Sequence, residues 1–326
     1  MSTAQTAGTG TARTAAPVTV RVPAKVNVQL AVGGLRPDGF HDLANVFLAV
    51  GLYDEITATA TAPGEGPRVT CSGPDTDQVP LDRTNLAVRA ADALAARYGL
   101  VPDVHLHIGK EIPVAGGMAG GSADAAGALL ACDALWGTGA SREELLEICA
   151  ELGSDVPFSL VGGAALGRGR GELLTPLEVG GVFHWVFAVA EGGLSTPAVY
   201  RECDRLREVR GGGAGADAVP APEASPALLA ALRAGDAAAL AGHLSNDLQP
   251  AAVSLLPSLD DTLAVGTQAG ALAALVSGSG PTCAFLAEDA ATASDVAFAL
   301  RASGVCRTAH TATSPAPGAT VVRPAG

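Results

Sequence analysis

Residues 113–126 have the sequence PVAGGMAGGSADAA, and no other segment of the chain is as informative. The segment follows an alternating, strand-like run that ends near Ile108, and it continues directly into an alanine- and leucine-rich helical pattern. Four of the six residues from Gly116 to Gly121 are glycine, so the backbone amides can approach a ligand closely. Ser122 is a suitable N-cap for the helix, and the free N–H groups of a helix start attract anions. The segment therefore predicts a loop that holds phosphate, with a flexible glycine hinge as the alternative.

Two common phosphate loops do not fit these residues. A Walker A loop needs lysine after its last glycine, whereas Ser122 follows Gly121. A dinucleotide-binding loop needs glycine at its first, third and sixth places, and neither Gly116 nor Gly117 as the first place satisfies this. A phosphate loop of another class is predicted.

Composition and charge exclude several classes of protein. Apolar residues make up 48% of the 326 residues and charged residues only 16%, which excludes a disordered chain and gives ample material for a core. The net charge of −13 makes non-specific binding to nucleic acid a poor hypothesis, although a small anion can still bind at a locally positive site. No apolar run reaches the roughly 18 residues of a membrane span.

The cysteines and the chain ends suggest a cytoplasmic protein. Six cysteines are scattered along the chain without a C-x-x-C pair, which is typical of reduced thiols. Residues 1–16 contain no apolar core of a secretory signal, and together with residues 312–326 they are expected to be disordered tails. A third segment, 211–226, has the composition of a flexible surface insertion.

Between these segments, strands and helices mix without regular βαβ alternation, which favours an α+β fold in two halves. We expect an N-terminal domain at 17–172 and a C-terminal domain at 173–311. The periodicity predicts strands at 26–32, 104–108, 183–190, 271–276, 282–287 and 305–311, and helices at 85–98, 141–152, 196–208, 226–243, 257–268 and 289–302. Ser141 and Glu144 form a predicted capping box.

Three further segments contain residues suited to chemistry. Lys25 lies at the entrance of a predicted strand, where its charge could reach a cleft. The segment 36–41 is RPDGFH, a tight turn followed by an aromatic residue and an imidazole that together could stack on and read a base. Asp155 follows directly after a predicted helix end. Taken alone, each has an ordinary explanation: a solvated lysine, a packing residue beside a polar loop, and a turn-forming carboxylate.

His105 and His107 share one face of a strand, but no third ligand accompanies them, so sheet-surface residues are a better interpretation than a metal site.

The order of the motifs resembles that of the GHMP kinases. Lys25 with Asn27 comes first, the 113–123 loop second, Gly153-Ser-Asp-Val-Pro157 third and Ser277-Gly-Ser-Gly-Pro-Thr282 last. The resemblance covers residues 18–311. The 36–41 motif narrows it to a branch that phosphorylates the 2-hydroxyl of a cytidine diphosphate-linked methylerythritol, in the non-mevalonate route to isoprenoid precursors.

This resemblance implies a two-domain fold with ATP, Mg²⁺ and the small-molecule substrate in the cleft between the halves. Asp155 would be the base toward the substrate hydroxyl, and Lys25 would stabilise and orient the reacting groups. ATP would lie on the loop formed by Pro113, Val114, Ala115, Gly116, Gly117, Met118, Ala119, Gly120, Gly121, Ser122 and Ala123. The substrate would be held by Asn27, Phe40, His41, Thr196 and Tyr200.

Several residues depart from the family pattern. Ala119 occupies a position where glycine is usual, Met118 one where leucine is usual, and Phe40 one where tyrosine is common. Ala123 replaces a common second serine, so the metal ligands stay unassigned. Another GHMP kinase with a homoserine or mevalonate acceptor, a nucleotide-binding module without catalysis and an interaction scaffold are the alternatives. The oligomeric state stays open between a monomer and a weak dimer.

Overall fold

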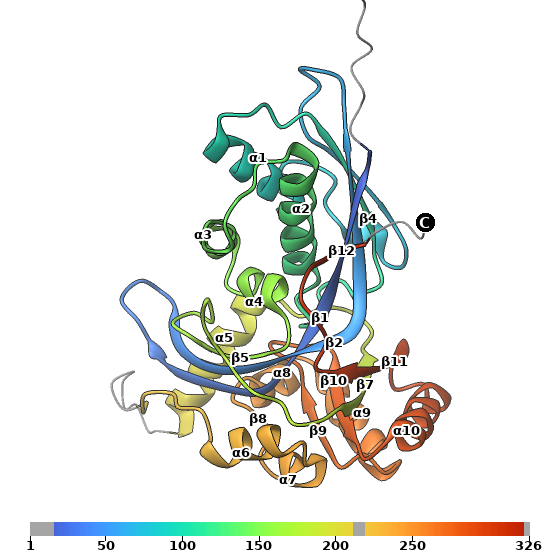
Figure 1. Cartoon of the computed structure of the whole chain (residues 1–326). Coiled ribbons are helices and arrows are strands. Elements are labelled where there is room, and N and C mark those ends of the chain that lie inside the picture. Colours follow the sequence, from blue (N-terminus) through green and yellow to red (C-terminus); the bar gives the residue numbers. More distant parts are fainter. Residues whose placement is uncertain (1–15, 211–218, 323–326) are drawn as a thin grey trace, which may run out of the picture.

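A computed structural model describes residues 16–210 and 219–322. It shows an α+β molecule built on two sheets, as predicted (Figure 1). The strands are β1 (Val18–Leu35), β2 (His41–Ala60), β3 (Arg68–Ser72), β4 (Val104–Gly109), β5 (Ala164–Arg168), β6 (Leu173–Pro176), β7 (Phe183–Val189), β8 (Ser245–Asn246), β9 (Ala273–Val276), β10 (Cys283–Ala287), β11 (Thr308–Ser314) and β12 (Thr320–Val322).

Ten α-helices and one short 3₁₀ helix lie between these strands in the described residues. They are η1 (Thr76–Gln78), α1 (Leu86–Tyr98), α2 (Gly120–Trp136), α3 (Arg142–Leu152), α4 (Val156–Val161), α5 (Thr196–Arg210), α6 (Pro226–Ala234), α7 (Ala237–Ala241), α8 (Gln249–Leu255), α9 (Ser258–Gln268) and α10 (Ala290–Ser303). The capping box of Ser141 and Glu144 is present at the start of α3, which confirms that prediction. None of these helices is long and apolar enough to pass through a membrane.

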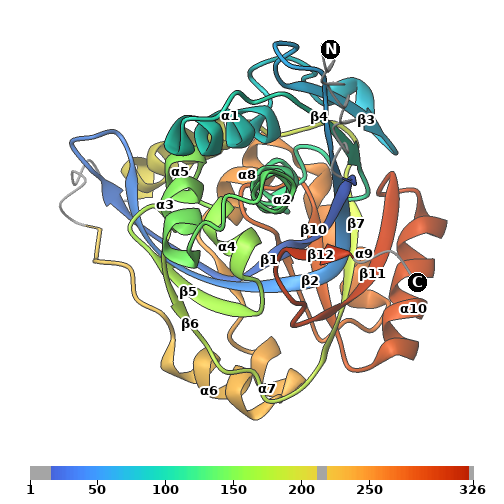
Figure 2. The same ribbon diagram turned by 45° about the horizontal axis from the view of Figure 1, so that its top comes forward.

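The first sheet has the order β12-β1-β2-β4-β3, with β5 and β6 continuing from β2 and β8 beside β1. Its two central strands are long, and register shifts between Pro23 and Ala24 and between Asn27 and Gln29 interrupt their pairing. Helices α1 to α4 lie together on one side of these strands (Figures 1 and 2). Helix α2 is the innermost of them, since most of its residues are buried.

The small residues of α2 explain how it can lie so close to the sheet. A Cβ atom on Gly127 would come within 2.6 Å of the Ile56 side chain and 2.8 Å of the Val22 side chain. Leu129 and Cys132 fill the remaining space and are fully buried. The alanine excess of the sequence is thus partly a packing requirement, because a larger residue would push the helix away from the sheet.

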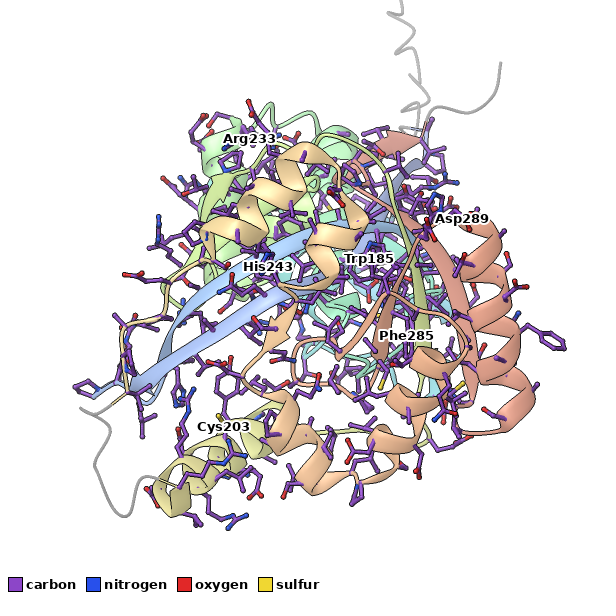
Figure 3. All side chains as sticks on the ribbon, turned by 90° about the horizontal axis from the view of Figure 1, so that it is seen from below. Trp185, Cys203, Arg233, His243, Phe285 and Asp289 are labelled. Carbon is purple, nitrogen blue, oxygen red and sulfur yellow. The ribbon has the colours of Figure 1, made fainter. Side chains whose placement is uncertain are left out.

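The second sheet has the order β11-β7-β10-β9, and α9 and α10 pack on it (Figure 1). Trp185 and Phe187 face the core of the first half, while Val186 and Phe285 face the core beneath these helices. This alternation is the period of two expected of a strand that is buried on both faces. Figure 3 shows Trp185 and Phe285 within the body of the molecule, and this sheet joins the two halves through a common core.

The halves are not consecutive in sequence, contrary to the expected boundary at residue 172. Strand β6 still pairs with β5 of the first sheet, so the chain crosses to the second sheet only between Pro176 and Phe183. Strands β8 and β12 later return to pair with β1. The expected division is therefore a simplification, because pairing between strands distant in sequence was not visible in the local pattern.

The expected C-terminal tail begins inside a strand. Residues 312–314 complete β11, residues 320–322 form β12, and Ala316 is buried, so 312–322 belong to the fold. The Thr/Ala/Pro/Gly composition had suggested disorder, but strand pairing with β1 and β7 satisfies the backbone. Residues 1–15 and 323–326 of the expected tails lie outside the described residues.

The segment 211–226 is also more integrated than expected in its second part, whereas 211–218 lie outside the described residues. The Gln29 amide donates to the Glu223 carbonyl, and its oxygen accepts from the Ser225 amide. Ser225 also caps α6. The single helix expected at 226–243 is divided into α6 and α7, because Gly235 adopts a left-handed conformation and Asp236 caps a new helix.

Candidate active site

The turn between the first two strands sits at one end of the candidate site. Gly39 has φ +82°, and the amide of Arg36 bonds the carbonyl of Phe40 at 2.7 Å, so residues 36–40 form the predicted tight turn. The Asp38 carboxylate accepts from the Phe40 amide. This turn fixes the direction in which Phe40 and His41 leave the hairpin.

The glycine loop leads into α2 as predicted, but the helix begins earlier than expected. Ala119, not Ser122, occupies the N-cap position, with φ +61° and no side-chain cap, and Gly120 is the first helical residue. Ser122 thus lies in the first turn and lines the cavity. The amides of this first turn have no partner inside the helix, and the helix dipole adds positive potential there.

Two loop glycines allow a close approach between the halves of the molecule. A Cβ atom on Gly117 would lie 2.2 Å from the carbonyl oxygen of Ser277, and one on Gly116 would lie 2.8 Å from the Thr282 hydroxyl. The Ser277 hydroxyl donates to the Gly117 carbonyl at 3.1 Å, and the Thr282 amide donates to the Gly116 carbonyl at 3.3 Å. The Ser277–Thr282 motif of the second half therefore braces the loop.

Lys25 lies in the middle of β1 rather than at a strand entrance, and its side chain is buried. Its ammonium donates to the Asn27 side chain at 2.5 Å and to the Gly117 carbonyl at 2.8 Å. The nearest Asp155 carboxylate oxygen is 3.9 Å from Nζ. Burial lowers the pKa of Lys25, and the negative charge of Asp155 opposes that shift.

Asp155 stands at the start of α4, in the N-cap position, but its side chain caps no amide. Its side chain is 34% exposed and lines the cavity. The carboxylate is thus available to a ligand on one side while Lys25 holds it from the other. A helix-capping role does not explain Asp155, because the carboxylate makes no bond to the helix that it begins.

Asn27 accepts a hydrogen bond from Lys25 and also lines the cavity. Its amide nitrogen donates to the Asn45 side chain at 2.8 Å, which turns its oxygen toward the Lys25 ammonium. Asn45, on β2, therefore belongs to the site although no sequence motif includes it. A buried asparagine opposite a strand residue gives no local signal, because only the pairing of β1 with β2 brings the two together.

At the other end of the cavity, the residues of the 36–41 motif lie in different surroundings. Phe40 is 48% exposed, and the Arg170 guanidinium lies 5.1 Å from its ring centre. His41 is buried, and its ring centre is 5.1 Å from that of Tyr200 on α5. The two neighbours therefore differ: Phe40 is exposed on the turn, whereas His41 is buried at the start of β2. Burial raises the pKa of the Tyr200 phenol.

Thr196 connects α5 to the second half. Its hydroxyl is 2.8 Å from that of Ser279, in the turn that braces the glycine loop. Both residues line the cavity together with Pro197 and Leu194. The start of α5 is in this way tied to the loop on which phosphate is expected.

One cavity of about 850 Å³ contains most of the predicted site residues. They are Lys25, Asn27, Phe40, His41, Ala115, Gly116, Gly117, Ala119, Gly120, Gly121, Ser122, Asp155, Thr196 and Tyr200. Pro113, Val114, Met118 and Ala123 are not among its lining residues, and the side chains of Met118 and Ala123 belong to the core. Sequence reasoning missed Asn45, Arg170, Arg201 and Asp204, which also line it and lie outside the motifs.

A buried charged cluster lies behind the loop. The Lys110 ammonium donates to Asp54 at 2.6 Å and to Asp124 at 2.8 Å, and a Cβ atom on Gly120 would lie 2.9 Å from it. The second Asp54 oxygen accepts from the amides of Glu111 and Ile112. Desolvation raises the pKa of Asp124 to about 7, while Lys110 opposes the shift. The cluster joins β2, β4 and α2 below the loop.

The chain matches two family models and many known proteins. Residues 85–163 match the GHMP kinases N terminal domain, and residues 228–306 match the GHMP kinases C terminal domain. A Streptomyces avermitilis protein named 4-diphosphocytidyl-2-C-methyl-D-erythritol kinase is 76% identical over 92% of this chain and 98% of its own length. A Thermobifida fusca protein of the same name is 59% identical over 92% of this chain and 97% of its own length.

Solved structures agree with this result. A crystal structure of 4-(cytidine 5'-diphospho)-2C-methyl-D-erythritol kinase is 32% identical, with a TM-score of 0.72 over 90% of this chain and 98% of that chain. A homoserine kinase from Cytophaga hutchinsonii is 20% identical, with a TM-score of 0.71 over 94% of this chain and 97% of that chain. The second similarity concerns the fold alone.

Proposed function

Since this chain belongs to the 4-diphosphocytidyl-2-C-methyl-D-erythritol kinases of the GHMP family, we propose that it phosphorylates the 2-hydroxyl of that cytidyl alcohol with ATP. The chain is an ATP-dependent small-molecule kinase, and the substrate class follows from its relatives. The product would serve the synthesis of isoprenoid precursors. The 36–41 motif and the cavity beside it support this acceptor over a smaller one such as homoserine.

A single observation carries the proposal: the Lys25 ammonium and the Asp155 carboxylate lie 3.9 Å apart in the cavity that the glycine loop also lines. These three pieces are far apart in the sequence. In the fold, the loop amides form a wall that can hold an anion, Lys25 supplies a cation, and Asp155 supplies a partly exposed carboxylate. This is the set of groups that phosphoryl transfer to an alcohol needs.

In the phosphoryl transfer, Asp155 and Lys25 have different roles. A bond forms from the substrate oxygen to the γ-phosphorus of ATP while the bond to the bridging oxygen breaks, and ADP leaves with that electron pair. Asp155 accepts the proton of the hydroxyl as this happens, since an alcohol is too weak an acid to ionise beforehand. Lys25, 3.9 Å from that carboxylate, orients the reacting groups and offsets negative charge on the transferring group.

The loop and the first turn of α2 fit a triphosphate. Gly116 and Gly117 leave the backbone bare, and the amides at the start of α2 are free to donate to phosphate oxygens. Mg²⁺ prefers oxygen ligands and keeps several phosphate and water oxygens, so it would neutralise phosphate charge when bound. Ser122 is the side chain that would hold it, since it lies in the first turn of α2 and lines the cavity.

The cytidine end would lie beside Phe40, His41 and Tyr200. Phe40 offers an aromatic face but lacks the hydroxyl of a tyrosine. Arg170 and Arg201 add positive charge to this end of the cavity, which suits a substrate with a diphosphate. Truncating His41 to alanine would therefore raise KM for the cytidyl substrate much more than KM for ATP.

The proposal is tested with Asp155→Asn and a panel of acceptors. The wild type should form ADP with the cytidyl alcohol and not with homoserine or mevalonate. Asp155→Asn should reduce kcat by about 100-fold or more with KM for ATP little changed, because general-base contributions run to about 10²–10⁴-fold. Glu151→Gln, an exposed change at the end of α3, is the matched control. A fully active Asp155→Asn enzyme would exclude this base, and turnover of another acceptor would exclude the substrate.

A further inference from the structure

Asp204 lies at the end of the cavity where the cytosine is proposed to bind. No sequence motif identifies this residue. It lies on α5 and lines the cavity, and its two oxygens are 3.0 and 3.2 Å from Nε2 of His41. His41 is buried at the start of β2, 163 positions earlier in the chain. The contact therefore joins the hairpin of the first half to a helix of the second.

The helix presents two residues to the same imidazole. Tyr200 and Asp204 are four residues apart on α5, so they lie on one face of it. The Tyr200 ring lies beside the His41 ring, with 5.1 Å between centres and 32° between planes, and Asp204 meets its Nε2 edge. Cys203 is buried next to them and anchors α5 to the core of the second half (Figure 3). Tyr200 thus limits the tilt of the imidazole ring, and Asp204 limits its rotation.

A carboxylate can only accept a hydrogen bond, so the proton of this contact belongs to Nε2. In the neutral ring the other nitrogen, Nδ1, then carries a lone pair. Within the part of the chain that the structure describes, the hydrogen bonds of the His41 side chain all go to Asp204. His41 also lines the cavity, and we take Nδ1 as the ring atom that a ligand would meet there.

We propose that Asp204 is a positioning residue which fixes the proton of His41 on Nε2 and thereby makes Nδ1 an acceptor that selects an amino-substituted base. The amino group of a cytosine can donate to this lone pair. A uracil tethered in the same pose would place a carbonyl oxygen against it, so the two acceptors would repel. Asp204 would in this way set the choice between cytosine and uracil without touching the base.

This inference rests on the proposed function, and its first test is a competition between two substrates. The ratio of kcat/KM for the cytidyl alcohol to kcat/KM for its uridyl analogue is measured for wild type and for Asp204→Asn. An asparagine can donate its amide hydrogen to Nε2, which moves the ring proton to Nδ1 and turns that atom into a donor. The ratio should fall by about tenfold or more, since each hydrogen bond lost or gained is worth about that factor.

The second test measures the tautomer itself. In protein labelled with ¹⁵N-histidine, two-bond proton–nitrogen spectra distinguish an Nε2–H ring from an Nδ1–H ring. The wild type should show His41 as Nε2–H, with the assignment made by comparison with His41→Gln. Asp204→Asn should shift it toward Nδ1–H, and Asp204→Ala should give a mixture. A merely structural role would change the melting temperature but not the tautomer.

Glu208→Gln is the matched control, because Glu208 lies one turn further along α5 and is exposed. It should leave the ratio and the spectrum as in wild type. An unchanged ratio in Asp204→Asn, or a wild-type ring protonated on Nδ1, would overturn the inference even though the enzyme phosphorylates the cytidyl alcohol. A wild type without that activity would instead overturn the proposed function.

Discussion

Lys25 is a buried cation whose surroundings act on it in opposite directions. Removal from water lowers its pKa, whereas Asp155 favours the charged form. Two further oxygens, from Asn27 and Gly117, accept its hydrogens. A lysine in such a place has its charge fixed in position, but that charge is lost at a lower pH than the ordinary value of 10.5.

The first prediction concerns this residue and the alkaline limit of activity. Because the ammonium loses its proton below the ordinary pKa of lysine, kcat/KM of the wild type should decline on the alkaline side before pH 10.5 is reached. Lys25→Arg keeps a cation throughout this range, so its lower activity should lack that decline. Rates from pH 7 to about 10 check this, with circular dichroism at each pH as a control for folding. The same decline in both proteins would show that deprotonation of Lys25 does not set the alkaline limit of activity.

At the scale of elements, the glycine loop depends on the second half for its shape. Gly117 has φ +72°, and a Cβ atom there would lie 2.2 Å from a backbone oxygen of the Ser277 turn. Ala115 and Ala119 also have positive φ, at 53° and 61°, so the loop retains two non-glycine residues in the left-handed region. That conformation costs an L-residue roughly 1–2 kcal/mol, so glycine would be the less strained residue at the position of Ala119.

The second prediction uses this close approach. Gly117→Ala should push the loop away from the Ser277 turn, raise KM for ATP by about tenfold or more and lower the melting temperature, since both the clash and the positive φ act against it. Gly242→Ala is the control, because Gly242 lies outside the cavity, has φ −69°, and its Cβ atom would meet only the Ala239 carbonyl oxygen, at 3.6 Å. ATP titrations and thermal unfolding of both variants measure the effect. Equal changes in both would show that the approach to Ser277 is not required.

The third prediction concerns the cluster that joins β2, β4 and α2. Desolvation and Asp54 raise the pKa of Asp124 to about 7, above the ordinary value of 3.8. The protonated form is then the stabilising one: its contribution is complete below pH 4 and is lost as the pH rises through 7. Asp124→Asn keeps an acceptor for Lys110 without the charge. The free energy of unfolding of the wild type, relative to this variant, should fall by about 1–3 kcal/mol between pH 5 and pH 8.

Denaturant unfolding at several pH values measures that difference. Asp133→Asn, on the same helix but outside the cluster, is the control, and it should not show this pH dependence. A difference that rises with pH would mean that Asp124 stays ionised in the fold. The sign thus decides whether Lys110 balances both carboxylates or only one.

The elements differ in how far the sequence predicted them, for physical reasons. The helix at 85–98 was predictable because Asn85 caps it and Gly99 ends it, and both signals are local. The division at Gly235 was missed because the apolar period continues across it. Within the candidate site, motifs identified Lys25 and Asp155. Asn45 and Asp204 could not be found in this way, because each acts through a partner that only the tertiary fold brings near.

At the scale of the whole molecule, the end of the chain closes the first half. The Ala316 amide donates to the Ala49 carbonyl, and its carbonyl accepts from the Gly163 amide. Gly318 packs on the backbone of Leu160 and Val161, so closely that a Cβ atom would lie 2.3 Å from an oxygen there. β12 then pairs with β1 (Figure 2). The segment 316–319, just before β12, therefore covers α4, whose first turn follows Asp155.

The fourth prediction is that a truncation after Ser314 destabilises the whole protein. It removes the bonds of Ala316 and the pairing of β12 with β1, and several backbone bonds at about 1 kcal/mol each give a loss of about 2–4 kcal/mol. Because α4 loses its cover next to Asp155, kcat should also fall, while KM for ATP should change little. Truncation after Val322 keeps every one of these contacts and is the matched control. Denaturant unfolding and steady-state rates measure both effects, and a truncated chain as stable as its control would show that this segment only rests on the surface.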